Sequence, residues 1–116
     1  MKHKTEGRSR NVKSAPRSSR KKSKKNELTL WDQASRWYDS LVGSQGTDFQ
    51  KDIIMPGVLR LLDVAKKDRV LDLACGQGVF SRYLSQKGIN VEGLDSSAEL
   101  LKYARTRSGS SIRYHV

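Results

Sequence analysis

A short apolar run at residues 70–74 leads directly into a glycine turn, and this junction constrains the fold more than any other part of the chain. The run contains a single acid, Asp72, and otherwise has the composition of a strand in a buried parallel sheet. The turn at residues 75–78 contains two glycines, and helically spaced apolar residues follow it as far as Gly88. A strand that turns tightly into a helix predicts the first half of a βαβ unit.

The same arrangement is repeated further along the chain. Residues 89–94 alternate in polarity as a strand does, and the strand ends at Asp95. Residues 96–99, Ser-Ser-Ala-Glu, form a capping box that opens a second helix, and residues 112–116 have the pattern of a third strand. The sequence therefore predicts an α/β fold in which a βαβαβ segment forms a parallel sheet with right-handed crossovers.

Two helices are predicted before the first strand. A capping box at residues 29–32 starts the first one, and apolar residues at helical spacing follow it. Trp31 and Trp37 on this helix are expected to be core or helix-docking residues. A second helix is predicted from Thr47, and Pro56 is expected to break or kink it because proline lacks the backbone N–H.

The positive charge of the chain is concentrated in its first 26 residues. They contain eleven Lys or Arg residues and one acid, whereas the remaining 90 residues contain twelve Lys or Arg and eleven acids. Residues 1–26 also contain too few apolar side chains to offset the entropy of ordering. We therefore expect a basic disordered tail at residues 1–26 and a folded domain at residues 27–116.

The composition also excludes several classes of protein. No apolar run is long enough for a signal peptide or a membrane span, so a cytoplasmic protein that does not contact membranes is expected. Cys75 is the only cysteine, which excludes an intrachain disulfide, and no His or second Cys lies at metal-ligand spacing, so no metal site is expected. Neither His3 nor His115 is expected to be catalytic.

The glycine turn and the second acid together suggest a nucleoside-containing cofactor. Asp95 follows Gly78 by 17 residues, at the end of the second predicted strand. In a doubly wound sheet, glycines at the first turn let the backbone approach a ligand, and such an acid accepts hydrogen bonds from ribose hydroxyls. A dinucleotide is the first alternative, but its motif requires Gly or Ala where this chain has Ser81.

The acid inside the first strand favours a cofactor that carries positive charge. Asp72 lies between Leu71 and Leu73, and a buried carboxylate is costly unless it is paired or hydrogen-bonded. A dinucleotide gives no reason for this acid. S-adenosylmethionine has an ammonium group and a sulfonium, and it lacks the pyrophosphate that a dinucleotide turn must hold.

Three segments resemble the class I S-adenosylmethionine-dependent methyltransferases. Residues 70–78 are similar to motif I of that family, and residues 93–97 resemble its next motif. Residues 37–39, Trp-Tyr-Asp, resemble the helix that precedes motif I in the small-molecule enzymes. The resemblance covers residues 29–116 and implies a Rossmann-like, doubly wound sheet, of which this chain contains the first half.

The resemblance implies a role for seven residues. Asp72 would face the amino group of S-adenosylmethionine, and Asp95 would bind both ribose hydroxyls. The backbone of the turn would pack against the methionine portion, Ser96 would lie beside the adenine, and Tyr38 would close over the cofactor. The three turn positions in question are Ala74, Gly76 and Gly78. The family often has glycine where this chain has Ala74.

The activity implied is methyl transfer to an unidentified acceptor, which the resemblance suggests is a small molecule. No catalytic residue and no oligomeric state is implied, because the family's sheet has seven strands and its later strands supply much of the substrate pocket. On this interpretation the chain is an N-terminal, truncated methyltransferase domain. Two alternatives remain: a non-catalytic fragment, and a nucleic-acid-binding module that acts through residues 1–26. That tail has no aromatic residue for stacking on bases.

Overall fold

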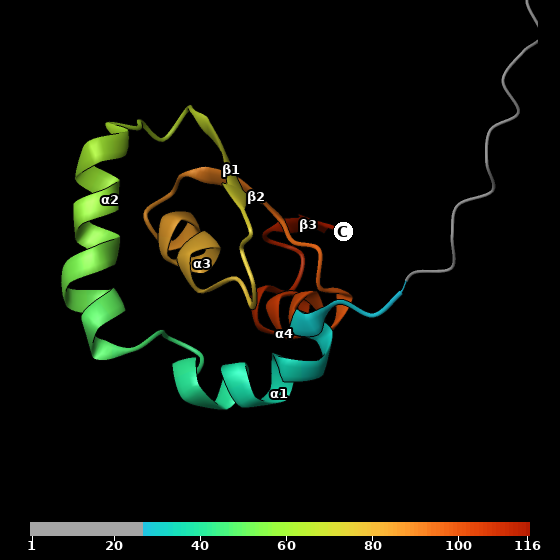
Figure 1. Cartoon of the computed structure of the whole chain (residues 1–116). Coiled ribbons are helices and arrows are strands. Elements are labelled where there is room, and N and C mark those ends of the chain that lie inside the picture. Colours follow the sequence, from blue (N-terminus) through green and yellow to red (C-terminus); the bar gives the residue numbers. More distant parts are fainter. Residues whose placement is uncertain (1–26) are drawn as a thin grey trace, which may run out of the picture.

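The computed structural model describes residues 27–116, so the predicted basic tail and its proposed affinity for nucleic acids lie outside the described residues. The elements are, in chain order, α1 (Leu30–Val42), the π-helical turn η1 (Gln50–Ile54), α2 (Met55–Leu62), β1 (Arg69–Leu73), α3 (Val79–Gln86), β2 (Asn90–Leu94), α4 (Ala98–Ser108) and β3 (Arg113–His115). Figure 1 shows α1 and α4 next to one another, with the strands between α2 and α4. Within the described part, no helix combines the length and the apolar character needed to cross a membrane.

The strands form a parallel sheet in the order β1-β2-β3. Val70 pairs with Val91 at the start of β1, and Gly93 pairs with Tyr114 in β3. This arrangement places the carboxyl ends of β1 and β2 side by side, so the glycine turn lies next to Asp95. The predicted βαβαβ segment and the α/β class are confirmed.

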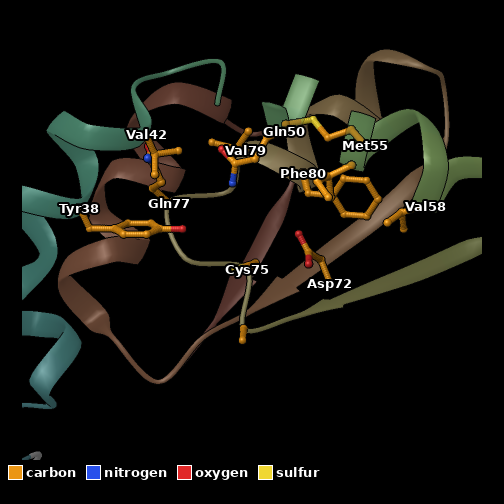
Figure 2. A pocket seen from close by; sticks show the side chains of 12 residues that line it. Tyr38, Val42, Gln50, Met55, Val58, Asp72, Cys75, Gln77, Val79 and Phe80 are labelled. Atoms are coloured by element: carbon orange, nitrogen blue, oxygen red, sulfur yellow. The ribbon is translucent and has the colours of Figure 1, made fainter. Parts of the chain in front are cut away.

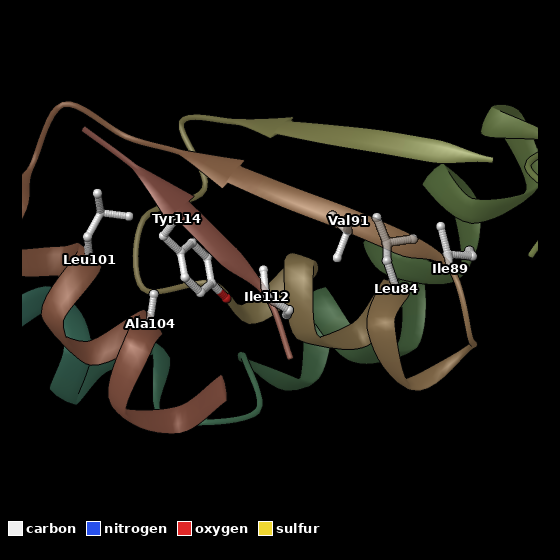
Figure 3. Packing of buried hydrophobic residues seen from close by; sticks show 7 residues of the cluster. All are labelled: Leu84, Ile89, Val91, Leu101, Ala104, Ile112 and Tyr114. Carbon is white, nitrogen blue, oxygen red and sulfur yellow. The ribbon is translucent and has the colours of Figure 1, made fainter. Parts of the chain in front are cut away.

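The core lies on one face of the sheet, under α3 and α4. Figure 3 shows both helices on the same side of the strands, with their apolar side chains meeting those of β2 and β3. The buried cluster consists of Leu84, Ile89, Val91, Leu101, Ala104, Ile112 and Tyr114. Each strand contributes alternate residues to this face, as the two-residue repeat of a strand requires.

The opposite face of the sheet is open in the described part of the chain. Leu71 is 54% exposed and Leu73 is 66% exposed, although both were predicted to belong to a strand that is buried on both faces. Glu92 joins the strands across this face: it accepts hydrogen bonds from Arg69 (3.0 Å) and Arg113 (2.5 Å) and pairs with His115 (2.8 Å). These partners, His115 first, hold the pKa of Glu92 at about 2.

Three local predictions about the helices need correction. Of the break or kink that was expected at Pro56, the break does not occur: the chain widens into η1 just before Pro56 and continues as α2, and the Met55 N–H donates to the Gln50 carbonyl five residues back. The wider turn accommodates a residue that has no N–H to donate. The cap of α4 is Ser97 rather than Ser96: the Ser97 hydroxyl accepts the Leu100 N–H at 3.1 Å, and the Ser97 N–H donates to Asp95 instead of to the predicted Glu99.

The third correction concerns the orientation of α1. Its predicted capping box is present, but Trp37 is 64% exposed and Trp31 is 50% exposed, so neither is a core residue. The apolar stripe of this helix points away from the sheet, and its more polar side, with Ser35 buried, faces the rest of the fold. Asp32 and Asp39 of α1 accept hydrogen bonds from Ser97, the cap of α4, and from Arg107 of α4. These contacts favour the orientation in which the polar side of α1 faces inward.

Candidate functional site

The turn after β1 has a backbone that few residues adopt. Ala74, Gly76 and Gly78 have φ values of +57°, +56° and +80°, all in the left-handed region. Glycine adopts this region without strain, whereas an L-residue such as alanine loses roughly 1–2 kcal/mol. Alanine at this position therefore adds backbone strain as well as a methyl group. Its strained backbone lies at the carboxyl end of the sheet, where ligands of such folds bind.

The two glycines of the turn are required for different reasons. A Cβ atom at Gly78 would lie 2.5 Å from the Tyr114 hydroxyl and 3.0 Å from the Ala104 side chain, so this glycine lets α3 pack closely against the core. A Cβ atom at Gly76 would meet nothing closer than the Tyr38 ring, at 3.8 Å. Because Gly76 has no side chain, a ligand can reach the backbone of the turn from the side on which Tyr38 of α1 lies.

Asp95 ties the end of β2 to this turn. Its side chain is buried (7% exposed), and it accepts the Gly76 N–H at 2.7 Å and the Ser97 N–H at 2.8 Å. The two bonds use different oxygens, and an ionised carboxylate has about four acceptor positions. Asp95 thus fixes the loop geometry and still has lone pairs for further donors.

Asp72 lies on the other side of the turn and is largely buried. The Ser81 hydroxyl donates to one of its oxygens at 2.6 Å. Burial raises the pKa of Asp72, and the negative charge of Asp95 acts in the same direction. Ser81 is the residue that departs from the dinucleotide motif, and its position here supplies a partner for the acid in the strand. The sequence analysis used Ser81 only to argue against a dinucleotide and missed this contact.

Cys75, between the two acids, is a poor nucleophile. Burial raises the pKa of its thiol to about 12, and the charges of Asp72 and Asp95 contribute to the increase. The thiolate is the reactive form, so Cys75 stays protonated at neutral pH. Within residues 27–116 no cluster of His, Cys, Asp and Glu side chains is arranged to hold a metal ion.

Two hollows flank the turn. The larger, of about 260 Å³, contains Asp72 at its base and has walls from α1, η1, α2 and α3 (Figure 2). The smaller, of about 140 Å³, is lined by Trp31, Tyr38, Ala74, Gly76, Asp95 and Leu100. Tyr38 and Ala74 belong to both. No Lys, Arg or His is among the residues that line either hollow, so two carboxylates face them without a cationic side chain.

Tyr38 is held in place by α1. Its ring meets the ring of Trp31 edge-on, with centroids 5.5 Å apart at 74°. The next residue on the helix, Asp39, forms a bidentate ion pair with Arg107 of α4, at 2.5 and 2.7 Å. Arg107 also donates to the side-chain oxygen of Gln77 in the glycine turn. One guanidinium thus joins α1, α4 and the turn.

A second contact between α1 and α4 lies at the start of both helices. One oxygen of Asp32 accepts from the Ser97 hydroxyl at 2.7 Å and from the Glu99 N–H at 3.1 Å. The other closes the capping box with Thr29. These donors, Ser97 first, hold the pKa of Asp32 well below its usual range.

The structure brings together six of the seven residues that were predicted from the resemblance. Ser96 is the exception, because it is exposed and lines neither hollow. Gly78 belongs to the turn, although its α-carbon faces Tyr114. Sequence reasoning missed Gln77 and Arg107. Their only signal was a polar residue between the two glycines and a basic residue near the end of α4, and neither is informative without the fold.

Comparison with known proteins relates the chain to a family. Residues 70–116 match the family model of a methyltransferase domain. Over 72 residues the chain is 42% identical to the malonyl-[acyl-carrier protein] O-methyltransferase of Pectobacterium atrosepticum, an alignment that covers 62% of this chain and 26% of that enzyme.

Two solved structures are similar in fold. The PH0226 protein of Pyrococcus horikoshii OT3 is 26% identical with a TM-score of 0.57, and the match covers 72% of this chain and 38% of that one. The SAH complex of DhpI is 25% identical with a TM-score of 0.54, and the match covers 77% and 42%. The chain spans between 12% and 36% of the length of the curated relatives that it matches.

Proposed function

Because the chain belongs to the class I S-adenosylmethionine-dependent methyltransferases, we propose that residues 27–116 are the part of such an enzyme that binds the cofactor. The binding site is the pair of hollows on either side of the glycine turn. The whole protein transfers a methyl group from the cofactor to a small-molecule acceptor. Residues 27–116 form one domain, separate from the basic segment at residues 1–26.

The observation that carries this proposal is the uncompensated negative charge of the hollows. Asp72 and Asp95 face them, and no cationic side chain is among the lining residues. A carboxylate in a partly dry site is stabilised when an opposite charge arrives. The sulfonium and ammonium of S-adenosylmethionine supply that charge. The pyrophosphate of a dinucleotide would instead meet two like charges.

The chain's own residues have distinct roles in this proposal. Asp95 binds the two ribose hydroxyls through the lone pairs that Gly76 and Ser97 leave free, and the exposed Ser96 lies beside the adenine. Asp72 receives the amino group of the methionine portion, while the Ser81 hydroxyl keeps the carboxylate oriented.

The turn and α1 complete the cofactor site. The backbone of Ala74, Gly76 and Gly78 packs against the methionine portion. Tyr38 borders both hollows and excludes water from the junction between them.

The chemistry is a displacement at a methyl group. When bound, S-adenosylmethionine supplies an electrophilic methyl on a positively charged sulfur. The described residues orient that group and keep water away, and they account for catalysis by positioning. We assign none of them as a general base.

A small-molecule acceptor is supported by the relatives and by the larger hollow. The names of three similar enzymes refer to malonyl-[acyl-carrier protein], a dTDP-linked amino sugar and ubiquinone biosynthesis, whereas the name of a fourth refers to 23S rRNA. The wall of the larger hollow is apolar, with Val42, Ile54, Met55, Val58 and Phe80 around Asp72. An apolar wall next to the methionine portion of the cofactor suits a small organic acceptor.

Equilibrium dialysis with radiolabelled S-adenosylmethionine tests the site. We expect the full chain to bind it and Asp95→Asn to weaken binding by about tenfold to a hundredfold, because charge-assisted hydrogen bonds contribute about 1.5–3 kcal/mol. The matched control is Glu92→Gln, which removes an acid from the open face of the sheet and should leave affinity unchanged.

Two outcomes would count against the proposed function. Unchanged affinity in a folded Asp95→Asn variant would remove this acid from the site. Tighter binding of NAD than of S-adenosylmethionine by the wild-type chain would show that the turn holds a dinucleotide.

A further inference from the structure

Gln77 is a buried amide with one end unsatisfied. Its side chain lies between the two glycines of the turn and is 1% exposed. Its oxygen accepts from Arg107, while its Nε2 has no hydrogen-bond partner among the described residues. Buried polar groups in folded proteins are nearly always paired, so an unpaired amide that lines a hollow indicates a missing partner.

The orientation of this amide is fixed by its neighbours. Exchanging the oxygen and the nitrogen would place an N–H group against the guanidinium of Arg107, which has only donors. Arg107 is itself held by two bonds to Asp39. The ion pair between α1 and α4 therefore keeps the oxygen of Gln77 on the arginine and leaves Nε2 for a different acceptor.

The hollow that Gln77 lines also contains Asp72. Figure 2 shows the two side chains on different parts of its wall, with Gln77 on the same side as Tyr38 and Val42. A carboxylate and an amide donor on one hollow are complementary to the two charged ends of an α-amino acid. The carboxylate pairs with the ammonium group, and the amide donates to the carboxylate.

We propose that Gln77 recognises the carboxylate of the cofactor's amino-acid portion, and that Arg107 and Asp39 are positioning residues that orient its amide. This inference rests on the proposed function, because it takes S-adenosylmethionine as the ligand. It explains why a buried amide stands between two turn glycines and why a bidentate ion pair reaches the turn.

Binding of two ligands distinguishes recognition of the carboxylate by Gln77 from a purely structural role of this residue. S-adenosylhomocysteine contains the amino-acid group, whereas 5′-methylthioadenosine contains the same nucleoside without it. Dialysis of the full chain with each gives a ratio of affinities. Loss of a contact to the carboxylate changes that ratio, and a general loosening of the site weakens both ligands together.

The most informative variant is Gln77→Glu. It keeps an oxygen for Arg107 and so preserves the link to α1, but it replaces the donor with a second acceptor. We expect S-adenosylhomocysteine to bind about tenfold or more weakly, 5′-methylthioadenosine to bind as it does to wild type, and the melting temperature not to fall. Gln86→Glu, the same change at an exposed position on α3, should alter neither ligand.

Arg107→Lys tests the positioning residue. Lysine keeps the charge beside Asp39 but cannot reach both the acid and Gln77 with a planar fork. The same selective loss, smaller than in Gln77→Glu, is expected. Binding of S-adenosylhomocysteine at the wild-type level in Gln77→Glu, or an equal loss for both ligands, would overturn the inference. Failure of the wild-type chain to bind either ligand would instead contradict the proposed function.

Discussion

The residue that departs most clearly from what its backbone requires is Ala74. Its φ of +57° costs an alanine roughly 1–2 kcal/mol, whereas a glycine pays only for its greater freedom in the unfolded chain. Two glycines in the same turn have the same sign of φ. The backbone strain of the turn is therefore confined to one residue, Ala74, which borders both hollows.

Replacing this alanine should relieve the strain. We expect Ala74→Gly to raise the free energy of unfolding by about 0.5–1 kcal/mol, the strain relieved minus the added entropy of the unfolded glycine. Denaturant titration followed by circular dichroism measures it. Ala34→Gly within α1 should have the opposite effect, a loss of about 1 kcal/mol. A destabilised Ala74→Gly variant would mean that the methyl group contributes packing that outweighs the strain.

Some residue contacts of the site were predictable and others were not. The glycine turn and the two acids were predictable, because they belong to two short sequence motifs, each at the end of a predicted strand. Ser81, Gln77 and Arg107 were missed, since their roles depend on partners that only the fold brings close. Gly78 was expected to contact the cofactor, and the structure adds a packing reason for it in Tyr114, 36 residues away.

At the scale of elements, the positions of the helices along the chain were predicted better than the sides that they turn inward. The capping box of α1 is a local signal between residues three positions apart, and it is present in the structure. The side of α1 that turns inward depends on Ser97 and Arg107, which lie more than 60 positions along the chain. An apolar stripe alone therefore predicted burial for Trp37, and that prediction was wrong.

The contact between α1 and α4 through Asp32 should make the fold sensitive to acid. Hydrogen bonds from Ser97, Glu99 and Thr29 hold its pKa in the folded state well below the ordinary value of 3.8. A depressed pKa adds stability that is complete above pH ~4 and is lost as the pH falls below that value. We therefore expect Asp32→Asn to lower the melting temperature at pH 7.

Thermal denaturation at pH 7 and at pH 3 checks this. The difference in melting temperature between wild type and Asp32→Asn should shrink at the lower pH, because the ionised carboxylate of Asp32 contributes less stability there. Asp63→Asn, at an exposed acid that ends α2, serves as the control and should show no such pattern. A difference that is constant across pH would mean that the charge of Asp32 does not stabilise the junction.

At the scale of the molecule, the sheet has an open face and an open edge within the described part. β1 pairs with β2 on one side only, and Leu71 and Leu73 are exposed on the uncovered face. An unpaired strand with apolar side chains is a template for association with another chain. The apolar composition of residues 70–74 suits a strand with a neighbour on each side, and within the described part β1 has only one.

We therefore expect the chain to self-associate at micromolar concentration. Sedimentation velocity over a range of concentrations should show an increasing mass, and the double variant Leu71→Lys with Leu73→Lys should reduce it. Leu61→Lys changes an equally apolar residue on α2, which is 87% exposed and away from the sheet, and should have no such effect. A concentration-independent monomer would show that the open sheet is self-sufficient.

The central claim is that the two acids and the glycine turn bind S-adenosylmethionine. Nuclear magnetic resonance of the ¹⁵N-labelled chain during a titration with S-adenosylhomocysteine tests it most directly. We predict saturable shifts of the backbone amides of Gly76, Gln77 and Ser97, because the first and last of these donate to Asp95. The amides of Arg69 and Arg113 on the open face should not move. Shifts confined to that face, or none at any residue of the turn, would contradict the account.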